Sequence, residues 1–326
     1  MRAKDEEPAL DGVQGRWAHT SADASAPSCP HVPTPHTAPP GAARWDGIVV
    51  LLATRRVGRP LWHLDRVAST MPLAHELAVA GAGDGAAVLA EEQWAGRGRR
   101  GRVWHAPHGS ALLCSIVFRP PLEPGRLFAL TMAVGLGLCR GVERATGLRP
   151  LVKWPNDLLL DGRKVAGVLA AGRLRGAALD HAVVGFGLNV NLRPEDLPPV
   201  AADSRGALPA TSLAIALGRP VDRLPLLAAT LEEIDRAYAL LWDGRAGELD
   251  AAWHERLAGL GQSIRVETEG GPFAGRFAGV DRDGALLLDT ARGSERVLAG
   301  EVVLGPRPMG IENPPRVCPE PSDGKG

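Results

Sequence analysis

The sequence predicts an α+β domain followed by a small all-β module. Between residues 61 and 242, apolar runs of strand length are interspersed with two long segments of helical periodicity. From Gly261 onward only short β-like runs remain, and Gly-Gly and Asp-Gly pairs join them as hairpin turns would. A chain of 326 residues, 45% of them hydrophobic, can bury a core of this size.

Both ends of the chain are expected to be disordered, because they contain too few large apolar residues to offset the entropy of ordering. The predicted division is a Pro/Ala-rich disordered tail at 1–43, a larger domain at 44–258, a smaller domain at 259–305 and a second disordered tail at 306–326.

The larger domain contains four predicted strands, each bounded by Gly, Pro or charged residues. They are Leu61–Val67, Ala86–Ala90, Leu112–Phe118 and Ala182–Val190. Two long helices are predicted, at Arg126–Thr146, which Gly147 would end, and at Val221–Trp242. A shorter helix should begin at Ser69-Thr70, because these residue types cap helices and Pro72 would fall in the first turn.

The smaller domain contains four predicted strands of its own. They are Ile264–Thr268, Phe273–Val280, Ala285–Asp289 and Arg296–Leu298. Short strands in close succession are typical of a small barrel.

Charge and cysteine usage restrict the class of protein. Lys and Arg together number 37, as do Asp and Glu, so no global field steers the chain toward nucleic acid or an anionic membrane. The four cysteines form no CxxC pair, which favours a reducing compartment without disulfides or a zinc site. With no apolar segment typical of a signal peptide or a membrane span, the chain is expected in the cytoplasm.

The stretch Gly96–Arg102, GRGRRGR, places four arginines and three glycines between two predicted strands. Glycines let the backbone approach a ligand closely, and guanidinium groups suit phosphate. The segment is therefore interpreted as a clamp for a small anion, a contact for nucleic acid or a solvated loop. The first interpretation is favoured, because Trp94 and Trp104 flank the run but no aromatic residue inside it could stack on bases.

A second motif reads KWPNDLLLDGRKVAGVL, and its Asp161-Gly162 pair between apolar runs indicates a two-residue hairpin turn. That turn would pair Leu159 with Lys164. Asp157 would then pair with Ala166, which would put Asp157 and Lys164 diagonally on one face of the ribbon. A lysine in a hairpin is most often solvated, so the spacing alone leaves its role open.

Other polar groups carry weaker signals. The stretch GFGLNVN at 185–191 places two asparagines at a predicted strand end, where turn-forming Asn is common. A helix start at Ser69-Thr70 could also bind an anion. His105 and His108 have no nearby Cys or carboxylate pair, so they are interpreted as loop histidines rather than metal ligands.

The ordered set of motifs closely resembles the biotin protein ligases. The set comprises ST at 69–70, EEQWAGRGRRGRVW at 91–104, KWPNDLLLDGRKVAGVL at 153–169, GFGLNVN at 185–191 and ATSL at 210–213. The resemblance runs from about Trp62 through Val303. It implies a class II synthetase-like, mixed-sheet catalytic domain followed by a small SH3-like β-barrel.

The resemblance implies an ATP-dependent, AMP-forming ligase. Biotin would react with ATP, with Mg²⁺ present, to give biotinyl-5′-AMP. The biotinyl group would then pass to a specific lysine of a biotin carboxyl carrier protein or domain of a carboxylase. No nucleic acid or membrane partner is expected, and the chain should be a monomer or a weak homodimer.

The resemblance also implies roles for individual residues. The implied catalytic residues are Arg97, Arg99, Asp157 and Lys164. The implied biotin-binding residues are Ser69, Thr70, Gln93, Gly96, Arg97, Lys164 and Gly167. The implied adenylate-binding residues are Arg99, Arg102, Trp104, Asn156 and Asn189. No direct metal ligand is implied, and Mg²⁺ would arrive with ATP near Asp157.

The chain departs from the family pattern in two places. Ala171 stands where the family usually has Glu, which is expected to affect the support of Lys164, and Met71-Pro72-Leu73 replaces polar or acidic residues. The ordered part before Trp62 is expected to be too short for the winged-helix repressor domain of many bacterial relatives. The rival interpretations are a lipoyl or octanoyl ligase, which lacks this arginine loop, and a nucleic-acid-binding protein that uses it.

Overall fold

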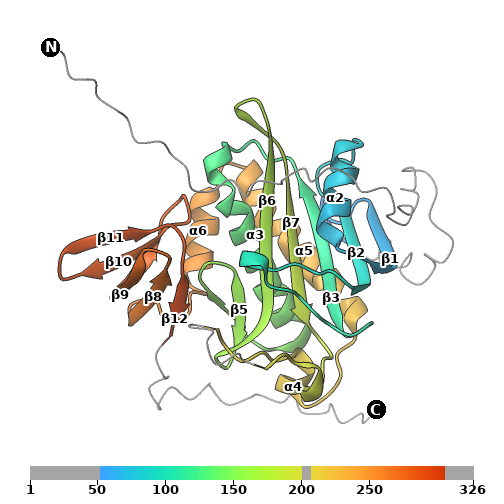
Figure 1. The fold of residues 1–326 in the computed structure, drawn as a ribbon. Helices are drawn as coiled ribbons and strands as arrows, with labels where there is room; N and C mark the ends of the chain where they lie inside the picture. The colour runs from blue at the N-terminus through green and yellow to red at the C-terminus, as the bar shows by residue number, and fades with distance from the viewer. Residues whose placement is uncertain (1–51, 200–206, 305–326) are drawn as a thin grey trace, which may run out of the picture. The chain divides into compact units, whose positions relative to one another are not determined.

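The computed structural model describes residues 52–199 and 207–304. They form a seven-stranded mixed sheet flanked by helices and a separate five-stranded antiparallel sheet (Figure 1). The predicted class, a mixed-sheet α+β domain followed by a small β module, is therefore confirmed. The tails predicted at 1–43 and 306–326 lie outside the described residues.

The seven-stranded sheet has the order β1-β2-β3-β7-β6-β5-β4. Strand β1 pairs with β2 in parallel, and every other pair in this sheet is antiparallel. Its strands are β1 (Leu61–Val67), β2 (Ala87–Gln93), β3 (Ala111–Phe118), β4 (Leu151–Lys153), β5 (Asp157–Leu160), β6 (Arg163–Arg175) and β7 (Ala178–Asn189). The four predicted strands correspond to β1, β2, β3 and β7. Strands β5 and β6 were predicted as a hairpin ribbon only, and the three-residue β4 was missed.

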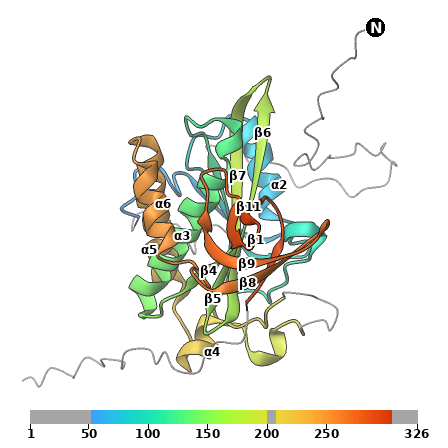
Figure 2. The same ribbon diagram turned by 90° about the vertical axis from the view of Figure 1, so that its left-hand side faces the viewer.

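Helices cover both faces of this sheet (Figure 2). They are α2 (Thr70–Val79), α3 (Phe128–Thr146), α4 (Leu213–Leu217), α5 (Arg223–Trp242) and α6 (Ala246–His254). Because side chains alternate along a strand, Val88 and Val117 pack with α2. Leu89 and Ile116 face the opposite side and belong to the larger core beneath α3 and α5. Short 3₁₀ turns lie at Arg99–Gly101, Pro124–Arg126 and Pro194–Asp196.

Helix α3 is apolar on nearly all sides, because it packs between the sheet and the helices α5 and α6. Gly147, in the left-handed conformation with φ 74°, ends it as predicted. Contrary to the prediction that no apolar segment has the length of a membrane span, the segment Pro124–Thr146 could cross a membrane by length and composition, but 72% of its most apolar window is buried inside the protein. That burial is typical of a core helix.

The C-terminal sheet has the order β11-β10-β9-β8-β12. Its strands are β8 (Ser263–Thr268), β9 (Gly271–Val280), β10 (Leu286–Thr290), β11 (Gly293–Val297) and β12 (Glu301–Val303). Strands β8, β9 and β10 were predicted, the predicted strand Arg296–Leu298 covers only the last two residues of β11, and β12 was missed. This sheet contacts the larger domain, because the buried Trp154 indole N–H donates a hydrogen bond to the Gly284 carbonyl at 2.9 Å.

Candidate active site

A pocket of about 370 Å³ opens beside the start of α2 and brings together motifs that lie far apart in the sequence. Its lining includes all but one of the residues predicted for the site. They are Ser69, Thr70, Gln93, Arg97, Arg99, Arg102, Trp104, Asn156, Asp157, Lys164, Gly167 and Asn189. The exception is Gly96.

Lys164 and Asp157 form an ion pair in the wall of the pocket, with 2.6 Å between Nζ and Oδ1. The turn that joins their strands has positive φ at Asp161 (49°) and at Gly162 (76°), as the predicted two-residue hairpin requires. Asp157 occupies one of the three donors of the ammonium group. The remaining donors can serve anionic oxygens in the pocket.

The register of this hairpin differs from the predicted one. Leu159 pairs with Lys164 as expected, but the register then shifts, so Asp157 pairs with Gly167 and the predicted pairing with Ala166 was wrong. A β-bulge adds one residue to one strand and leaves no mark in the hydrophobic alternation. The predicted proximity of Asp157 and Lys164 nevertheless holds.

The backbone of Lys164 is fixed by the segment 209–211, which carries part of the ATSL motif. The Lys164 N–H donates to the Pro209 carbonyl, and the Thr211 N–H donates to the Lys164 carbonyl, each at 2.8 Å. Asn189, which is buried, holds this segment from the other side by donating to the Thr211 carbonyl at 3.0 Å. Asn189 therefore positions the segment that holds the Lys164 backbone.

Trp104 packs against two glycines that face each other across β6 and β7. A Cβ atom on Gly187 would lie 2.4 Å from the Trp104 ring, and one on Gly167 would lie 3.2 Å from it. The Lys164 Nζ lies 5.6 Å from the ring centroid. Within the described residues, the indole N–H is buried without a hydrogen-bond acceptor. Gly187 was not predicted, although a glycine in an apolar strand is a signal of close approach.

The arginine stretch folds back on itself beside the pocket. The Trp104 N–H donates to the Gly96 carbonyl at 3.0 Å, and the Gly98 N–H donates to the Arg102 carbonyl at 2.7 Å. Gly96 does not line the pocket, and a Cβ atom there would lie 2.4 Å from the Trp104 carbonyl oxygen. Gly96 thus allows the loop to approach the Trp104 backbone closely, and its predicted contact with biotin stays a prediction. Arg97 bridges to Val103 through the backbone.

Arg99 is anchored between the loop and the second motif. Its Nη1 donates to the Asn156 side-chain oxygen at 3.0 Å, and the Asn156 amide donates to the Val168 carbonyl at 2.8 Å. Burial lowers the pKa of the Arg99 guanidinium, and the adjacent Arg100 lowers it further. The carboxylates of Glu301 and Asp157 oppose this shift. Arg99 lines the pocket, and Asn156 holds its guanidinium group.

Glu301, from β12 of the C-terminal sheet, completes the charge network and was not predicted. One carboxylate oxygen accepts from Arg102 at 2.8 Å, and the other pairs with Lys153, which is only 2% exposed. Burial alone would raise the pKa of Glu301, but Lys153 and then Arg102 outweigh it and lower that pKa. The small domain therefore supplies a carboxylate to the arginine loop.

The pocket lining also contains uncharged polar groups. The Thr70 N–H and hydroxyl both donate to the Gln93 side-chain oxygen, at 2.7 and 3.0 Å, and the same hydroxyl lies 2.7 Å from the Ser115 hydroxyl. Ser69 stands at the N-cap of α2, but its side chain makes no cap hydrogen bond. The predicted capping role was wrong for Ser69. Ser115 was missed, because nothing in its apolar strand distinguishes it.

Within the described residues, no three His, Cys, Asp or Glu side chains form a group that could hold a metal ion. Asp157 is the one carboxylate among the described lining residues. His105 also lines the pocket, whereas His108 pairs with Asp65 at 2.8 Å on the surface. Ala171 pairs with Val183 in the sheet and does not line the pocket, so it gives no direct contact to Lys164.

Two family models match this chain. Residues 64–189 match the biotin/lipoate A/B protein ligase family, and residues 259–305 match the biotin protein ligase C-terminal domain. These ranges contain every predicted site residue as well as Glu301.

Curated relatives and solved structures agree with these matches. The chain is 36% identical over 246 residues to a biotin–acetyl-CoA-carboxylase ligase of Paracoccus denitrificans, covering 74% of this chain and 99% of the relative. It is 32% identical over 266 residues to the bifunctional ligase/repressor BirA of Bacillus subtilis, covering 82% and 80%. Among structures, the Aquifex aeolicus biotin protein ligase in complex with biotin and ATP matches with a TM-score of 0.60 and 28% identity, covering 74% and 97%.

Proposed function

This chain belongs to the biotin protein ligase family, and we propose that it uses ATP to attach biotin to a lysine of a biotin carboxyl carrier protein or domain. In the first step, a biotin carboxylate oxygen attacks the α-phosphorus of ATP, and pyrophosphate leaves. In the second, the carrier lysine amine attacks the acyl carbon of biotinyl-5′-AMP, and AMP leaves. The observation that carries this proposal is the meeting of Lys164 and the arginine loop in one pocket.

Two groups of lining residues support different roles. Ser69, Thr70 and Gln93 offer uncharged donors and acceptors, which suit the polar ring of biotin. Arg97 and Arg99 line the same pocket, and their guanidinium groups suit phosphate. A substrate with an uncharged head at one end and a phosphate at the other matches this division of polarity.

Lys164 is proposed to stabilise the charge that develops during adenylation. Its ammonium group lines the same pocket as both groups, and Asp157 holds it in place at 2.6 Å. Fixed cations near a phosphoryl group need no reorganisation as negative charge accumulates. Arg102 and Trp104 are proposed to contact the adenylate, with Asn156 fixing Arg99 and Asn189 fixing the segment 209–211 beside Lys164.

Mg²⁺ is proposed to arrive with the nucleotide. This ion usually keeps several waters and takes one or two carboxylates together with phosphate oxygens. The single carboxylate of Asp157 fits that pattern, whereas a site built from protein groups alone does not. When bound, the ion would neutralise phosphate charge.

The proposed setting is the cytoplasm, and the proposed state is a monomer or weak homodimer without a nucleic-acid partner. Cys114 and Cys139 are buried free thiols, as a reducing compartment favours. Burial raises the pKa of Cys139 to about 12, so it stays protonated. The formal net charge of zero supports a partner other than nucleic acid.

The proposal is tested with labelled biotin, ATP, Mg²⁺ and an apo carrier domain. We expect ATP-dependent labelling of the carrier, and a roughly 100-fold or larger loss of rate for Lys164→Ala, because removing one preorganised charge stabiliser typically costs that much. Arg163→Ala, at the exposed neighbouring position, is the matched control. Labelling that lipoate suppresses as well as unlabelled biotin does would favour the lipoyl ligase alternative instead.

The role of Asp157 is tested in the two half-reactions separately. If Asp157 acts only by orienting Lys164 or the nucleotide, Asp157→Asn should slow pyrophosphate release but leave transfer from preformed biotinyl-5′-AMP unchanged. A slower transfer step as well would indicate that Asp157 also takes the proton of the incoming lysine.

A further inference from the structure

The arginine loop leaves the sheet at a point where two paired strands separate. The ladder between β2 and β3 ends at the pair Ala90 and Leu113. Residues 94–110 then run out to form the loop and return to β3. A loop of this length depends on whatever fixes its two ends.

Arg223, at the first position of α5, bridges those two ends. Its Nη1 donates to the Ala111 carbonyl at 3.2 Å, where β3 begins, and its Nη2 lies 2.8 Å from Oε2 of Glu91 in β2. The bridge therefore continues the β2–β3 contact beyond the last backbone pair. A guanidinium can bind two acceptors at once in fixed geometry, which an ammonium group cannot.

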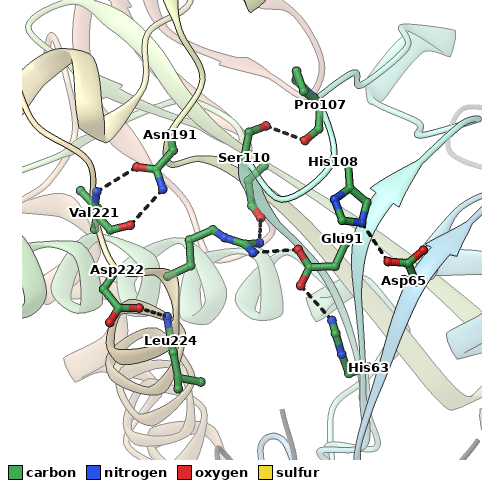
Figure 3. A network of polar contacts seen from close by, with 12 residues as sticks. His63, Asp65, Glu91, Pro107, His108, Ser110, Asn191, Val221, Asp222 and Leu224 are labelled. Carbon is green, nitrogen blue, oxygen red and sulfur yellow. Dashed lines mark hydrogen bonds and ion pairs between the residues drawn. The ribbon is translucent and has the colours of Figure 1, made fainter. Parts of the chain in front are cut away.

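The bridge is itself fixed from two sides. On one side, the second oxygen of Glu91 lies 2.9 Å from His63 Nε2 in β1. On the other side, Asn191 exchanges two hydrogen bonds with the backbone of Val221, each at 2.9 Å (Figure 3). Val221 lies two residues before Arg223, so these bonds hold the start of α5.

The same asparagine reaches the returning end of the loop. The Asn191 N–H donates to the Ser110 carbonyl at 2.7 Å, and the Gly109 N–H donates to the Glu91 carbonyl at 3.2 Å. These contacts connect β2 to the start of α5, the start of α5 to Asn191 just beyond the end of β7, and Asn191 to the returning end of the loop. Neither Glu91 nor Arg223 is among the residues that line the pocket.

The Glu91 carboxylate that pairs with Arg223 is ionised at neutral pH. Burial would raise the pKa of Glu91, but the hydrogen bond to His63 and the charge of Arg223 outweigh it and lower that pKa to about 2. Glu91 is 7% exposed, so bulk solvent screens the pair with Arg223 weakly. The ion pair is thus intact across the physiological pH range.

We propose that Arg223 and Glu91 are positioning residues for the ligase reaction, which fix the base of the arginine loop so that its arginines face the pocket. This inference rests on the proposed function. It predicts that breaking the bridge impairs adenylation and also lets biotinyl-5′-AMP escape into solution, because the loop no longer closes reproducibly over a water-sensitive mixed anhydride.

The test compares Arg223→Met, Arg223→Lys and Glu91→Gln in the full-length protein. For Arg223→Met we expect adenylation to slow by roughly 10- to 100-fold, the loss that follows from small misplacement of reacting groups. The fraction of biotinyl-5′-AMP found free rather than transferred to the carrier should rise several-fold. Arg223→Lys should recover only part of the loss, because it keeps the charge but not the fork.

Arg144→Met is the matched control. Arg144 pairs with Glu232 and Glu233 between α3 and α5, so this variant removes a similar ion pair that includes no residue of the loop or of the pocket. We expect it to lower Tm without raising the free biotinyl-5′-AMP. A rise in free adenylate in Arg144→Met equal to that in Arg223→Met would reduce Arg223 to a general stabilising residue and overturn the proposal.

A double-mutant cycle gives an independent criterion. If Arg223 and Glu91 act as one unit, the double variant should lose no more activity than the worse single variant. Additive losses would contradict the proposal. If the wild-type protein itself fails to adenylate biotin, the proposed function fails. Wild-type activity with unaffected variants overturns only the inference about the bridge.

Discussion

The position of the Trp104 ring depends on glycine residues, which have no Cβ atom. A Cβ atom on Gly187 would lie 2.4 Å from the indole ring, closer than carbon atoms can approach. In Gly187→Ala the ring must therefore move away from β7. Since Trp104 is proposed to contact the adenylate, this substitution tests that assignment by adding a single methyl group.

Overpacking of this kind costs about 1–3 kcal/mol, which corresponds to a roughly 5- to 150-fold loss of affinity. We expect Gly187→Ala to raise the KM for ATP within that range in a pyrophosphate-release assay. Gly247→Ala in α6, where an added Cβ meets nothing within 4 Å, should leave KM unchanged. An unchanged KM in Gly187→Ala would remove Trp104 from the nucleotide site.

Helices α3 and α5 pack so closely that glycine is required at their crossing. A Cβ atom on Gly137 would lie 2.6 Å from the Ile234 backbone, and one on Gly141 would lie 2.5 Å from the Thr230 backbone. Backbone atoms cannot rotate away as a side chain can. The helices would have to separate, and the core between them would lose contacts.

We expect Gly137→Ala to lower the free energy of unfolding by about 1–3 kcal/mol or more, and thermal unfolding would measure it as a Tm lowered by several degrees. Gly135→Ala in the same helix is the control, because its Cβ would meet the Trp253 ring nitrogen at an ordinary 3.6 Å. That variant should be neutral or slightly stabilising, since Ala favours helix over Gly by about 1 kcal/mol. Equal effects of both variants would refute the crossing argument.

Helix α2 is joined to β7 by two histidines. His75 Nδ1 lies 2.9 Å from His181 Nε2, and the other nitrogen of His181 lies 2.8 Å from Asp180. Burial lowers the pKa of His75 to about 4, and the charges of His181 and Arg173 add to the shift. In the native protein His75 is therefore neutral at pH 7.

The sign of the pH effect follows from this lowered pKa. Between the unfolded value of 6.5 and about 4, the unfolded chain binds a proton that the native protein does not. The free energy of unfolding is therefore not lowered by the titration of His75 above pH 6.5, and it decreases as the pH falls from 6.5 toward 4. We expect Tm to fall less between pH 7.5 and 5 in His75→Gln than in wild type. A His75→Gln variant whose Tm falls as steeply as that of the wild type over this range would contradict the assignment.

Sequence patterns predicted the elements whose signals are local. The Asp161-Gly162 turn identified the hairpin, and Gly147 marked the end of α3. The bulge between Lys164 and Gly167 was not predictable, because a bulge changes pairing without changing composition. Strand β12 has three residues, too few to display an alternation of polar and apolar side chains.

Most residues of the site were predicted because they belong to sequence motifs. The residues that were missed form contacts between those motifs or support them. Glu91 and Arg223 are separated by 132 positions, and only the folded sheet brings them to 2.8 Å. Glu301 is an ordinary charged residue in its own strand, and its role arises from the docking of the small domain beside Lys153. Such pairings depend on tertiary contacts, about which a single sequence carries no direct signal.

Through Glu301, the C-terminal domain contacts a residue that lines the pocket. Its carboxylate contacts Arg102 of the arginine loop and the buried Lys153. Removing one partner of a buried ion pair leaves an uncompensated charge, which costs about 3–5 kcal/mol. We expect Glu301→Gln to lower Tm and to raise the KM for ATP.

A second variant separates stability from positioning. Replacing the pair with apolar side chains, in Lys153→Met/Glu301→Leu, removes both charges, so Tm should recover toward wild type. The contact to Arg102 stays absent, so the KM for ATP should remain raised. Recovery of both quantities in pyrophosphate-release and thermal unfolding assays would mean that Glu301 serves only stability.

The buried indole N–H of Trp104 gives the pocket an optical property of its own. This group lacks an acceptor within the described residues, and the Lys164 ammonium lies 5.6 Å from the ring centroid. The emission of a tryptophan depends on nearby charge and on water, and both change when an anion occupies the pocket. Comparison of the wild-type protein with Trp104→Phe would isolate this emission from that of the other seven tryptophans. The protein therefore carries a native fluorophore in the pocket where its two proposed substrates would meet. Substrate binding could be followed by the fluorescence of Trp104 without attaching a dye.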